Sequence, residues 1–407
     1  MALLAARDLG RLHDPASVLA LNVGSAGVKA ASYARISDDP NEHYPVQLAG
    51  RASVENTHGA STPAGDDARN GLAELVRQLP DLHEGPDTVV HRIVHGGDRP
   101  GPAELTPATR VQLQDFSALA PLHQPPALAL VRAAIERWPD ARQIAVFDTS
   151  WHQTMAERHR VFPLPYALYS SGVKRYGFHG LAFQSAMRQL GTVAPELSMG
   201  RLVLAHLGGG SSLCAVRDGA CVNTTMGMTP LGGIAMASRS GSLDPGVLLH
   251  LQRSLGMSED EIDRLLWHES GLKGLSGESG DMRKLLVSAS DGARLAVDVY
   301  VSGVVQGIAA MAASNRGVDA LVFSGGIGAN AAGIRARVTD ELAWMGLQIE
   351  PGLNQAGALE MSASATTVRT FALPVDEETE MVFAIEKMQS GQIQPSHPMS
   401  GEGSNAQ

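Results

Sequence analysis

The chain has 407 residues, a formal net charge of −10 and 44% hydrophobic residues. This length exceeds what one hydrophobic core usually serves, so we expect two domains. The acidic balance argues against nucleic acid or an anionic membrane as the main partner, although a local basic pocket for small anions is compatible with it.

The two ends of the chain differ in composition from the rest. Residues 1–16 contain Asp8 and Asp14 and no sustained apolar run, so they resemble neither a signal peptide nor a membrane anchor. We expect a short N-terminal extension there. Residues 390–407 are rich in Gly, Ser, Pro and Gln, and they cannot bury enough apolar surface to order themselves. We expect a disordered tail.

Between these ends, the hydrophobic pattern predicts two successive units of hairpin strands followed by helices and strands. The first has a hairpin from Val18, an extended stretch near 45–54, a helix over 66–79, a strand over 88–94, helices across 107–137 and a strand over 143–147. The second has hairpin strands at Leu202 and Leu213, a strand over 320–323 and a helix from Asn330. The longest helix is predicted from apolar residues on one face, Val301, Val304, Val305, Ile308 and Met311. This order predicts two α/β domains with a ligand cleft between them.

Three β-runs end in loops of glycine and small residues, over 18–29, 202–212 and 320–330. The first two are typical of strand, tight turn, strand, and the third of strand, turn, helix. Backbone N–H groups in such loops are open to phosphate oxygens. No Walker A motif fits, because the segment from Gly24 to Lys29 lacks its spacing and the following Ser or Thr. Together the loops predict phosphate binding, while a tight turn without a ligand is the alternative for each loop alone.

Cationic or imidazole side chains also gather in segments interrupted by glycine or proline: Arg92, His95, His123, His179, His206 and Arg239. Phosphoryl transfer spreads negative charge over the equatorial oxygens, so a protein mainly positions the reactants and supplies countercharge. The fixed donor fork of arginine suits this task. Any one of these residues is more often a surface ion pair or a core histidine, but the set favours an anion site.

Asp148 follows the apolar strand over 144–147, so its carboxylate is expected at the carboxyl end of a strand, where α/β sheets place ligands. A turn or helix-cap aspartate is the alternative. Cys214 and Cys221 lie on a predicted hairpin, where small structural residues are expected rather than a disulfide or a metal pair. Two cysteines in this length indicate a reducing cytoplasm.

Several segments in fixed order resemble the acetate kinase family. They are Asn22 to Lys29, HRIVHGG from His91, APLHQPP from Ala120, VFDTSWHQTM from Val146, YGFHG from Tyr176, His206 to Ser212, Met226 to Pro230 with Ser238 to Pro245, Asp281 to Arg283, and Phe323 to Asn330. The resemblance covers roughly residues 18–387.

The resemblance implies the actin-like ATPase fold, with two ribonuclease H-like domains and an active-site cleft between them. We place an acyl- and phosphate-binding domain I at 17–149 plus 379–389 and a nucleotide-binding domain II at 150–378. The resemblance further implies ATP or ADP as co-substrate, Mg²⁺ or Mn²⁺ as cofactor, acetate as acceptor, and a homodimer.

By the same resemblance, Arg92 and Arg239 contact the acyl substrate and the transferred phosphoryl group, His179 stabilises the transition state, and His123 lies beside it. In the family, Asp148 is assigned as acid or base. Acetate is already ionised at pH 7, because carboxylic acids titrate near about 4. No proton needs to leave the nucleophile, so we favour Asp148 as an orienter of arginine or hydrated magnesium.

The remaining family positions fall into three sets. The expected metal ligands are Asn22 and Glu377, with the register open by one toward Asp376 or Glu378, and with an acidic helix N-terminus as the alternative for Glu377. The apolar residues matching the acyl pocket are Val94, Leu122, Phe178 and Pro230. The expected nucleotide-binding residues are Lys29, His206, Leu207, Gly208, Gly209, Gly210, Asp281, Met282, Arg283, Gly326, Ile327, Gly328, Ala329 and Asn330.

The chain departs from the family mainly in its phosphate loops. Ala26 and Gly27 replace consecutive serines, and Gly209 replaces an asparagine. Elsewhere, Gln124 replaces an asparagine, Leu181 to Phe183 replace a Thr-Ser-His run, and Gly232 and Ala329 each replace a glutamate. Lost donors near a transition state typically cost about 100- to 1,000-fold each. Weaker ATP use, a different donor such as pyrophosphate, and compensation by backbone N–H groups all stay open. Propionate or butyrate kinase is the nearest alternative activity, and a nucleotide-sensing protein is the alternative from another class.

Overall fold

A computed structural model describes residues 17–24, 27–35, 46–55, 65–79, 82 and 85–389. Contacts divide these residues into two compact units. Unit 1 comprises the described residues through Ser150 together with the C-terminal helix from Glu377, and unit 2 is Trp151–Asp376. The expected N-terminal extension at 1–16 and the expected tail at 390–407 lie outside the described residues.

Unit 1 is built on a six-stranded sheet in the order β3-β2-β1-β4-β6-β5. Strands β1, β2 and β3 form an antiparallel meander, and β4 and β6 continue the sheet parallel to β1. The elements are β1 Ser17–Gly24, β2 Gly27–Arg35, β3 Val46–Glu55, α2 Gly65–Arg77, β4 Thr88–Ile93, β5 Ala103–Glu104, α3 Pro107–Gln114, η2 Ser117–Leu119, α4 Gln124–Arg137, β6 Arg142–Phe147 and α16 Glu377–Gln389.

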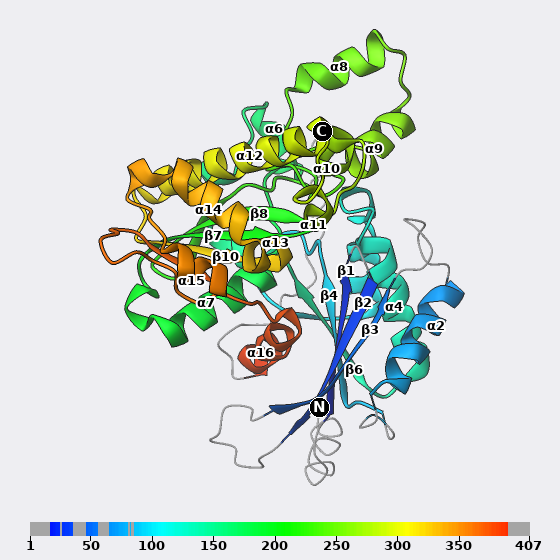
Figure 1. The fold of residues 1–407 in the computed structure, drawn as a ribbon. Helices are drawn as coiled ribbons and strands as arrows, with labels where there is room; N and C mark the ends of the chain where they lie inside the picture. The colour runs from blue at the N-terminus through cyan, green and yellow to red at the C-terminus, as the bar shows by residue number, and fades with distance from the viewer. Residues whose placement is uncertain are drawn as a thin grey trace. The chain divides into compact units, whose positions relative to one another are not determined.

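The two faces of the unit 1 sheet have different neighbours (Figure 1). Side chains alternate along a strand, so Leu19, Leu21 and Val23 of β1 share one face, where they pack in a cluster with α2 and α4. Asn22 lies on the opposite face and contacts the start of α16, which packs against β1, β4 and β6. The C-terminal helix is therefore part of the same unit as the N-terminal strands.

Unit 2 repeats this strand arrangement. Its sheet has the order β11-β10-β7-β8-β9, with an antiparallel meander from β7 to β9 and with β10 and β11 parallel to β7. The elements are η3 Ser150–Thr154, which begins at the last residue of unit 1, α5 Glu157–Arg160, α6 Tyr166–Ser170, α7 Gly180–Val193, η4 Pro195–Leu197, β7 Arg201–Leu207, β8 Ser211–Arg217, β9 Ala220–Thr224, α8 Pro245–Arg253, α9 Glu259–His268, α10 Gly271–Ser276, α11 Met282–Leu285, α12 Asp291–Asn315, β10 Ala320–Ser324, α13 Gly325–Asn330, α14 Ala332–Glu341, η5 Ala343–Met345, α15 Pro351–Ala356 and β11 Arg369–Ala372.

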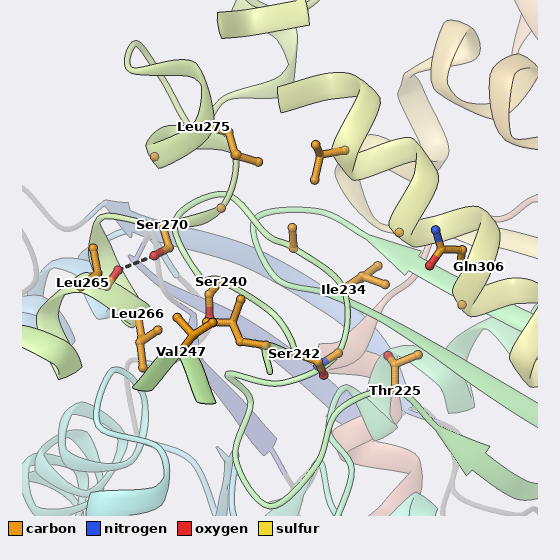
Figure 2. A pocket seen from close by; sticks show the side chains of 18 of the residues that line it. Thr225, Ile234, Ser240, Ser242, Val247, Leu265, Leu266, Ser270, Leu275 and Gln306 are labelled. Carbon is orange, nitrogen blue, oxygen red and sulfur yellow. Dashed lines mark hydrogen bonds between the residues drawn. The ribbon is translucent and has the colours of Figure 1, made fainter. Parts of the chain in front are cut away.

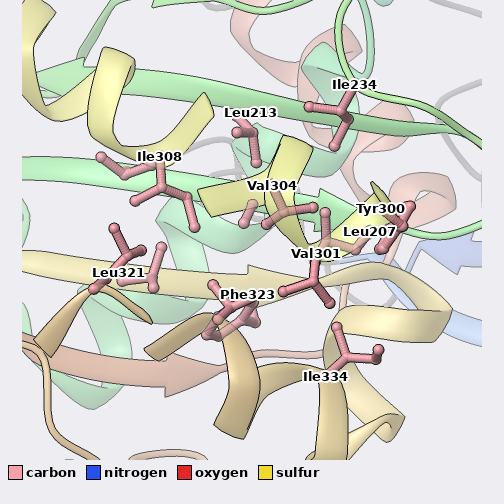
Figure 3. Packing of buried hydrophobic residues seen from close by; sticks show 14 of the residues in the cluster. Leu207, Leu213, Ile234, Tyr300, Val301, Val304, Ile308, Leu321, Phe323 and Ile334 are labelled. Atoms are coloured by element: carbon pink, nitrogen blue, oxygen red, sulfur yellow. The ribbon is translucent and has the colours of Figure 1, made fainter. Parts of the chain in front are cut away.

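Helix α12 is the centre of the unit 2 core. Tyr300, Val301, Val304 and Ile308 lie on one face of the helix and pack against Leu207, Leu213, Leu321 and Phe323 of the sheet (Figure 3). Each buried aliphatic side chain contributes about 1.5–3 kcal/mol relative to an exposed one. The helix is long and apolar enough by composition to cross a membrane, but this packing identifies it as the core helix of unit 2.

The third glycine segment differs from the predicted strand, turn, helix. Strand β10 ends at Ser324 and α13 begins at Gly325 with no intervening turn. Gly325 has φ +76°, and a Cβ built there would lie 2.6 Å from the carbonyl oxygen of Leu207. Only glycine fits this left-handed position against the neighbouring strand, so the chain changes direction within one residue.

Candidate active site

Four side chains of unit 1 converge at the carboxyl ends of its parallel strands. Arg92 lies on β4, Asp148 directly follows β6, Asn22 lies on β1, and Glu377 begins α16. Parallel strands present their carboxyl ends at one edge of a sheet, which explains how positions far apart in sequence meet. We call these four residues the Arg92 cluster.

The guanidinium of Arg92 uses all its nitrogen atoms within this cluster. Its Nε and Nη2 donate to the two carboxylate oxygens of Asp148 at 2.9 and 2.7 Å. Its Nη1 donates to Asn22 Oδ1 at 3.0 Å and to Glu377 Oε2 at 2.9 Å. The two parallel bonds to Asp148 fix the plane of the guanidinium.

The cluster is rich in negative charge. Asp148 is completely buried and Arg92 is only 8% exposed. Burial by itself lowers the pKa of Arg92, but the charges of Asp148, Glu377 and Glu378 raise it above its ordinary value. Asn22 Nδ2 also donates to both Glu377 and Glu378, at 2.9 and 2.6 Å. Because Arg92 stays charged, the bond to Asp148 orients a permanent cation and supports the predicted orienting role.

Lys29 lies opposite Asn22 in the antiparallel pairing of β1 and β2. Directly opposite residues share a face of the sheet, so the exposed Lys29 is adjacent to the Arg92 cluster. The tip of this hairpin, including Ala26 of the first glycine loop, lies outside the described residues.

Gln124, a departure from the family pattern, has a clear structural role. Its side chain accepts from the backbone N–H of His95 at 3.1 Å and donates to the carbonyls of His95 and Leu113 at 3.0 and 2.9 Å. It is fully buried and fixes the loop that follows β4. The predicted His123 is buried at the N-terminal end of α4, while the predicted pocket residues Val94 and Leu122 are buried and half-buried.

In unit 2, the second and third glycine loops lie at the ends of the paired strands β7 and β10. His206 pairs with Ser324 in the parallel register, and its Nδ1 lies 3.2 Å from the Ser324 hydroxyl. A Cβ built on Gly208 would lie 3.6 Å from the backbone nitrogen of Gly326, so the two loops meet. Gly209 and Gly326 face open space, because a Cβ at either would have no neighbouring atom within 4 Å. The backbone at these two glycines is therefore open to the approach of a ligand.

His179 has an unusual backbone conformation. It caps the N-terminus of α7 with φ 60° and ψ 26°, a left-handed conformation that is costly for a residue with a side chain. Its Nδ1 lies 2.9 Å from the Ser212 hydroxyl, and its ring centroid lies 4.8 Å from that of His206. Such strain persists where the surroundings hold a side chain in a particular place.

Arg239 and His179 both face Gly210. A Cβ built on Gly210 would lie 2.9 Å from Arg239 Nη2 and 3.0 Å from His179 Nε2. An alanine at this position would push the ends of the two side chains away, so glycine lets the loop backbone approach them this closely. We call His179, His206, Gly208, Gly209, Gly210 and Arg239 the glycine-loop site.

The charge of Arg239 lacks a neutralising partner. It is 4% exposed, and its Nη1 donates to the carbonyl of Pro230 at 2.7 Å. Within the described part of the chain, no carboxylate forms an ion pair with this guanidinium, and burial lowers its pKa to about 10. It remains charged at pH 7. An uncompensated buried cation beside an accessible glycine loop is an anion-binding arrangement.

The predicted adenosine contacts divide between surface and core. Asp281 caps α11 and forms a two-pronged ion pair with Arg283, whose side chain is 90% exposed. Met282, by contrast, is 3% exposed and packs in the core of unit 2. The Met282 side chain therefore supports the core instead of offering a ligand surface. Asn330 is exposed, and its Nδ2 donates to Gly326 O across α13.

Glycine at position 210 gives a direct prediction. Gly210→Ala should lower turnover at least about 100-fold, because the added methyl displaces the two groups that would stabilise a transition state. Gly209→Ala, with open space at its Cβ, should cost far less. Steady-state kinetics of the two purified variants would check this difference, and equal losses would show that Gly210 has no special contact with Arg239 and His179.

A divalent metal needs oxygen ligands, and the Arg92 cluster supplies carboxylates and an amide. Mg²⁺ is usually bound by one or two carboxylates together with waters and substrate phosphates. Among the described residues, the one compact group of three potential Asp, Glu, His or Cys ligands contains no acidic residue, so Asp148, Glu377 and Glu378 do not form such a group. Glu377 is the most accessible of these carboxylates, at 15% side-chain exposure. The donor set fits Mg²⁺ when a nucleotide supplies the remaining ligands.

Sequence reasoning missed the roles of Ser212 and His152, and it left Glu378 only as an alternative in register. Glu378 and Ser212 bind predicted site residues, and His152 holds the backbone beside His179 by a bond from Nε2 to Phe178 O at 2.9 Å. His152 also packs on Gly177, where a Cβ would lie 2.5 Å from its ring. These residues lie far along the chain from the site residues that they contact, so no local pattern identifies them. Glu378 was an alternative only because it belongs to the acidic run that includes Glu377.

The repeated sheet order, with the Arg92 cluster in one unit and the glycine-loop site in the other, is the architecture of the actin-like ATPase fold. The Acetokinase family matches residues 17–383, and the chain belongs to this family. It is 38% identical to an acetate kinase of Rhodopseudomonas palustris (strain TIE-1), over 92% of this chain and 98% of that one.

Two solved structures are similar to this chain as well. Acetate kinase of Porphyromonas gingivalis is 31% identical, with a TM-score of 0.74 over 90% of this chain and 98% of that one. A propionate kinase of Francisella tularensis is 28% identical, with a TM-score of 0.78 over 91% and 98%.

Proposed function

We propose that this protein is an acetate kinase that transfers the γ-phosphoryl group of ATP to acetate, giving acetyl phosphate and ADP, and that it also runs in reverse. Arg239 carries the proposal: a buried, charged guanidinium without a carboxylate partner among the described residues, facing a glycine loop in a member of the Acetokinase family. A transferring phosphoryl group supplies the missing negative charge.

In this mechanism a carboxylate oxygen of acetate attacks the γ-phosphorus in line. The bond between that phosphorus and the bridging oxygen breaks, and ADP leaves with the electron pair. Arg239 and His179 neutralise the equatorial oxygens in the transition state, while the backbone N–H groups of Gly209 and Gly210 hold the phosphate chain. No side chain has to remove a proton, because acetate is already ionised.

The Arg92 cluster acts on the acceptor side. Within unit 1, Arg92, oriented by Asp148, binds the carboxylate of acetate, and Val94 and Leu122 contact its methyl group. Glu377 and Asn22 would hold Mg²⁺, which would supply additional charge neutralisation on the phosphates. The nucleotide base and ribose bind near Asp281, Arg283 and the start of α13.

A matrix of acceptors and donors tests the proposal. Acetate, propionate and butyrate would each be assayed as hydroxamates with Mg²⁺ and with ATP or pyrophosphate. We expect acetate with ATP to give the highest kcat/KM and propionate to follow, since one methylene changes binding by only about 1–3 kcal/mol. Propionate kinase is the second candidate, because a propionate kinase of known structure is 28% identical to this chain. Higher kcat/KM with propionate would select it, and binding of ATP without any acyl phosphate would refute both.

We also propose a homodimer formed through α8 and its neighbours. Helix α8 carries leucine and valine side chains, yet none of its residues is buried within the chain. The exposed apolar residues of this surface, which we call the α8 surface, are Leu243, Val247, Leu248, Leu249 and Leu255. Beside it lies a groove of about 880 Å³ lined by residues of α8, α9, α10 and α12 (Figure 2). None of the predicted site residues lines this groove. An apolar helix and groove within one unit suit a second copy of the same surface.

The dimer gives a prediction that is independent of activity. Leu249→Asp should convert the protein to a monomer, because it places a charge in the apolar surface that the second copy would bury. Light scattering coupled to size-exclusion chromatography would measure the mass. Val111→Asp, at a 63% exposed position on α3, is the matched control and should leave the dimer intact. A dimer of unchanged stability in the Leu249→Asp variant would exclude the α8 surface as the interface.

We place the enzyme in the cytoplasm, in accord with its two free cysteines.

A further inference from the structure

A second cluster of ligand-type side chains lies outside both groups of site residues. Cys214 on β8, Cys221 on β9 and His152 on η3 are between 0 and 2% exposed. The two sulfur atoms are 3.4 Å apart, and His152 Nδ1 is 3.1 Å from Cys221 Sγ. All three ligand atoms lie within 4.8 Å of one another. The sequence predicted small structural residues at the two cysteines rather than a metal pair, and it did not single out the histidine, which is 69 positions from Cys221.

The histidine turns its Nδ1 atom toward the sulfur atoms. Its Nε2 lies 2.9 Å from the carbonyl oxygen of Phe178, which can only accept, so Nε2 carries the proton. In the neutral imidazole the lone pair is then on Nδ1, which lies 3.1 Å from Cys221 Sγ. A ring N–H held by a backbone carbonyl, with the other nitrogen free, is the usual state of a metal-ligating histidine.

The apolar surroundings and the ligand types determine which metal ions this cluster would bind. The ring of Phe183 lies edge-on to His152 at 5.8 Å, and Leu202, Leu204 and Val216 belong to the same apolar cluster. Two sulfurs and an imidazole in such a place suit soft ions and not Mg²⁺ or Ca²⁺. We propose that His152, Cys214 and Cys221 form a three-ligand site for a thiophilic d¹⁰ cation of the class of Zn²⁺ and Cu⁺.

The distance between the two sulfur atoms needs little change to accept such an ion. Metal–sulfur bonds of about 2.3 Å at a tetrahedral angle separate two sulfurs by roughly 3.8 Å, so the sulfurs would move apart by about 0.4 Å. Cys214 S–H now donates to Cys221 Sγ, and binding releases both thiol protons to solvent. Two thiolates with a neutral imidazole balance a divalent charge, whereas a monovalent ion leaves one negative charge.

The first experiment uses the full-length chain, reduced and freed of metal by a chelator. Titration with Cd²⁺ should produce an ultraviolet sulfur-to-metal charge-transfer band that saturates at one equivalent per chain, and Zn²⁺ should displace it. A parallel titration with Cu⁺ against a competing chelator separates the monovalent from the divalent source. Elemental analysis after gel filtration gives the stoichiometry.

Cys214→Ser and Cys221→Ser should each weaken Cd²⁺ binding by about 100-fold or more, since even residues behind the ligands are typically worth about 10- to 100-fold. Leu202→Val, in the same cluster but without a ligand atom, should bind normally. If a serine variant does not fold by circular dichroism, the corresponding Cys→Ala variant replaces it. The proposal would be overturned if the wild-type protein shows no charge-transfer band or if it binds less than a tenth of an equivalent of every metal. It would also be overturned if both cysteine variants retain the band.

Discussion

Replacing Arg239 with glutamine is expected to lower kcat by about a thousandfold or more while leaving the melting temperature unchanged or higher. An arginine that neutralises a transferring phosphoryl group typically contributes about 10³- to 10⁵-fold in rate. In the free protein, the same guanidinium is buried with its charge uncompensated by any described carboxylate, so its removal relieves a desolvation cost. Turnover and thermal unfolding of the purified variant would measure the two effects.

Ligand binding distinguishes this account from a structural role. ADP with phosphate should raise the melting temperature of the wild-type protein, and this increase should be smaller in Arg239→Gln because an anion partner is lost. Arg294→Gln, at an exposed arginine on α12, is the matched control and should keep normal activity. A strong loss of stability with normal turnover would mean that Arg239 serves only the fold.

Replacing Arg92 with leucine is expected to have the opposite effect on stability. The change leaves the buried Asp148 carboxylate without its two-pronged partner, and removing one member of a buried ion pair typically costs about 3–5 kcal/mol. Turnover should also fall about a thousandfold, because the guanidinium that binds acetate is gone. Urea unfolding and steady-state kinetics would measure both losses.

The pH dependence of the Arg92→Leu variant checks the cause. An unpaired buried carboxylate has a raised pKa in the folded state, so its destabilisation is present at neutral pH and disappears as the pH falls and Asp148 becomes protonated. The stability gap between wild type and variant should therefore narrow in acid. Arg142→Gln, which removes an exposed ion pair with Glu104, should change stability by less than about 1 kcal/mol. A gap independent of pH would rule out the buried charge as its source.

Much of the architecture follows from local pattern. The apolar runs before Lys29, Asp148 and Ser324 form strands, and the apolar face of α12 packs on the sheet as its spacing predicted. The resemblance to the family also identified the residues that the structure gathers in the Arg92 cluster and in the glycine-loop site. Strand ends are readable because an apolar run stops where polar or glycine residues begin.

The partners of these residues could not be read in the same way. Pairing of Arg92 with Asp148 depends on strand order, which no local pattern contains. The left-handed conformation of His179 and the missing counterion of Arg239 appear only once the chain has folded. At Gln124 the sequence was misleading in another way. Its difference from the family's asparagine suggested a lost hydrogen-bond donor, but its amide makes three hydrogen bonds that hold the loop after β4.

The central claim is that the chain moves a phosphoryl group between a nucleotide and a carboxylate, and the reverse reaction tests it most directly. Acetyl phosphate, Mg²⁺ and ADP would be mixed with the purified full-length protein and ATP formation followed over time. We predict one ATP for each acetyl phosphate consumed, with the rate falling about a thousandfold in Arg239→Gln. Tight binding of ADP by calorimetry with no ATP formed would contradict the account and indicate a nucleotide-binding protein without acyl transfer.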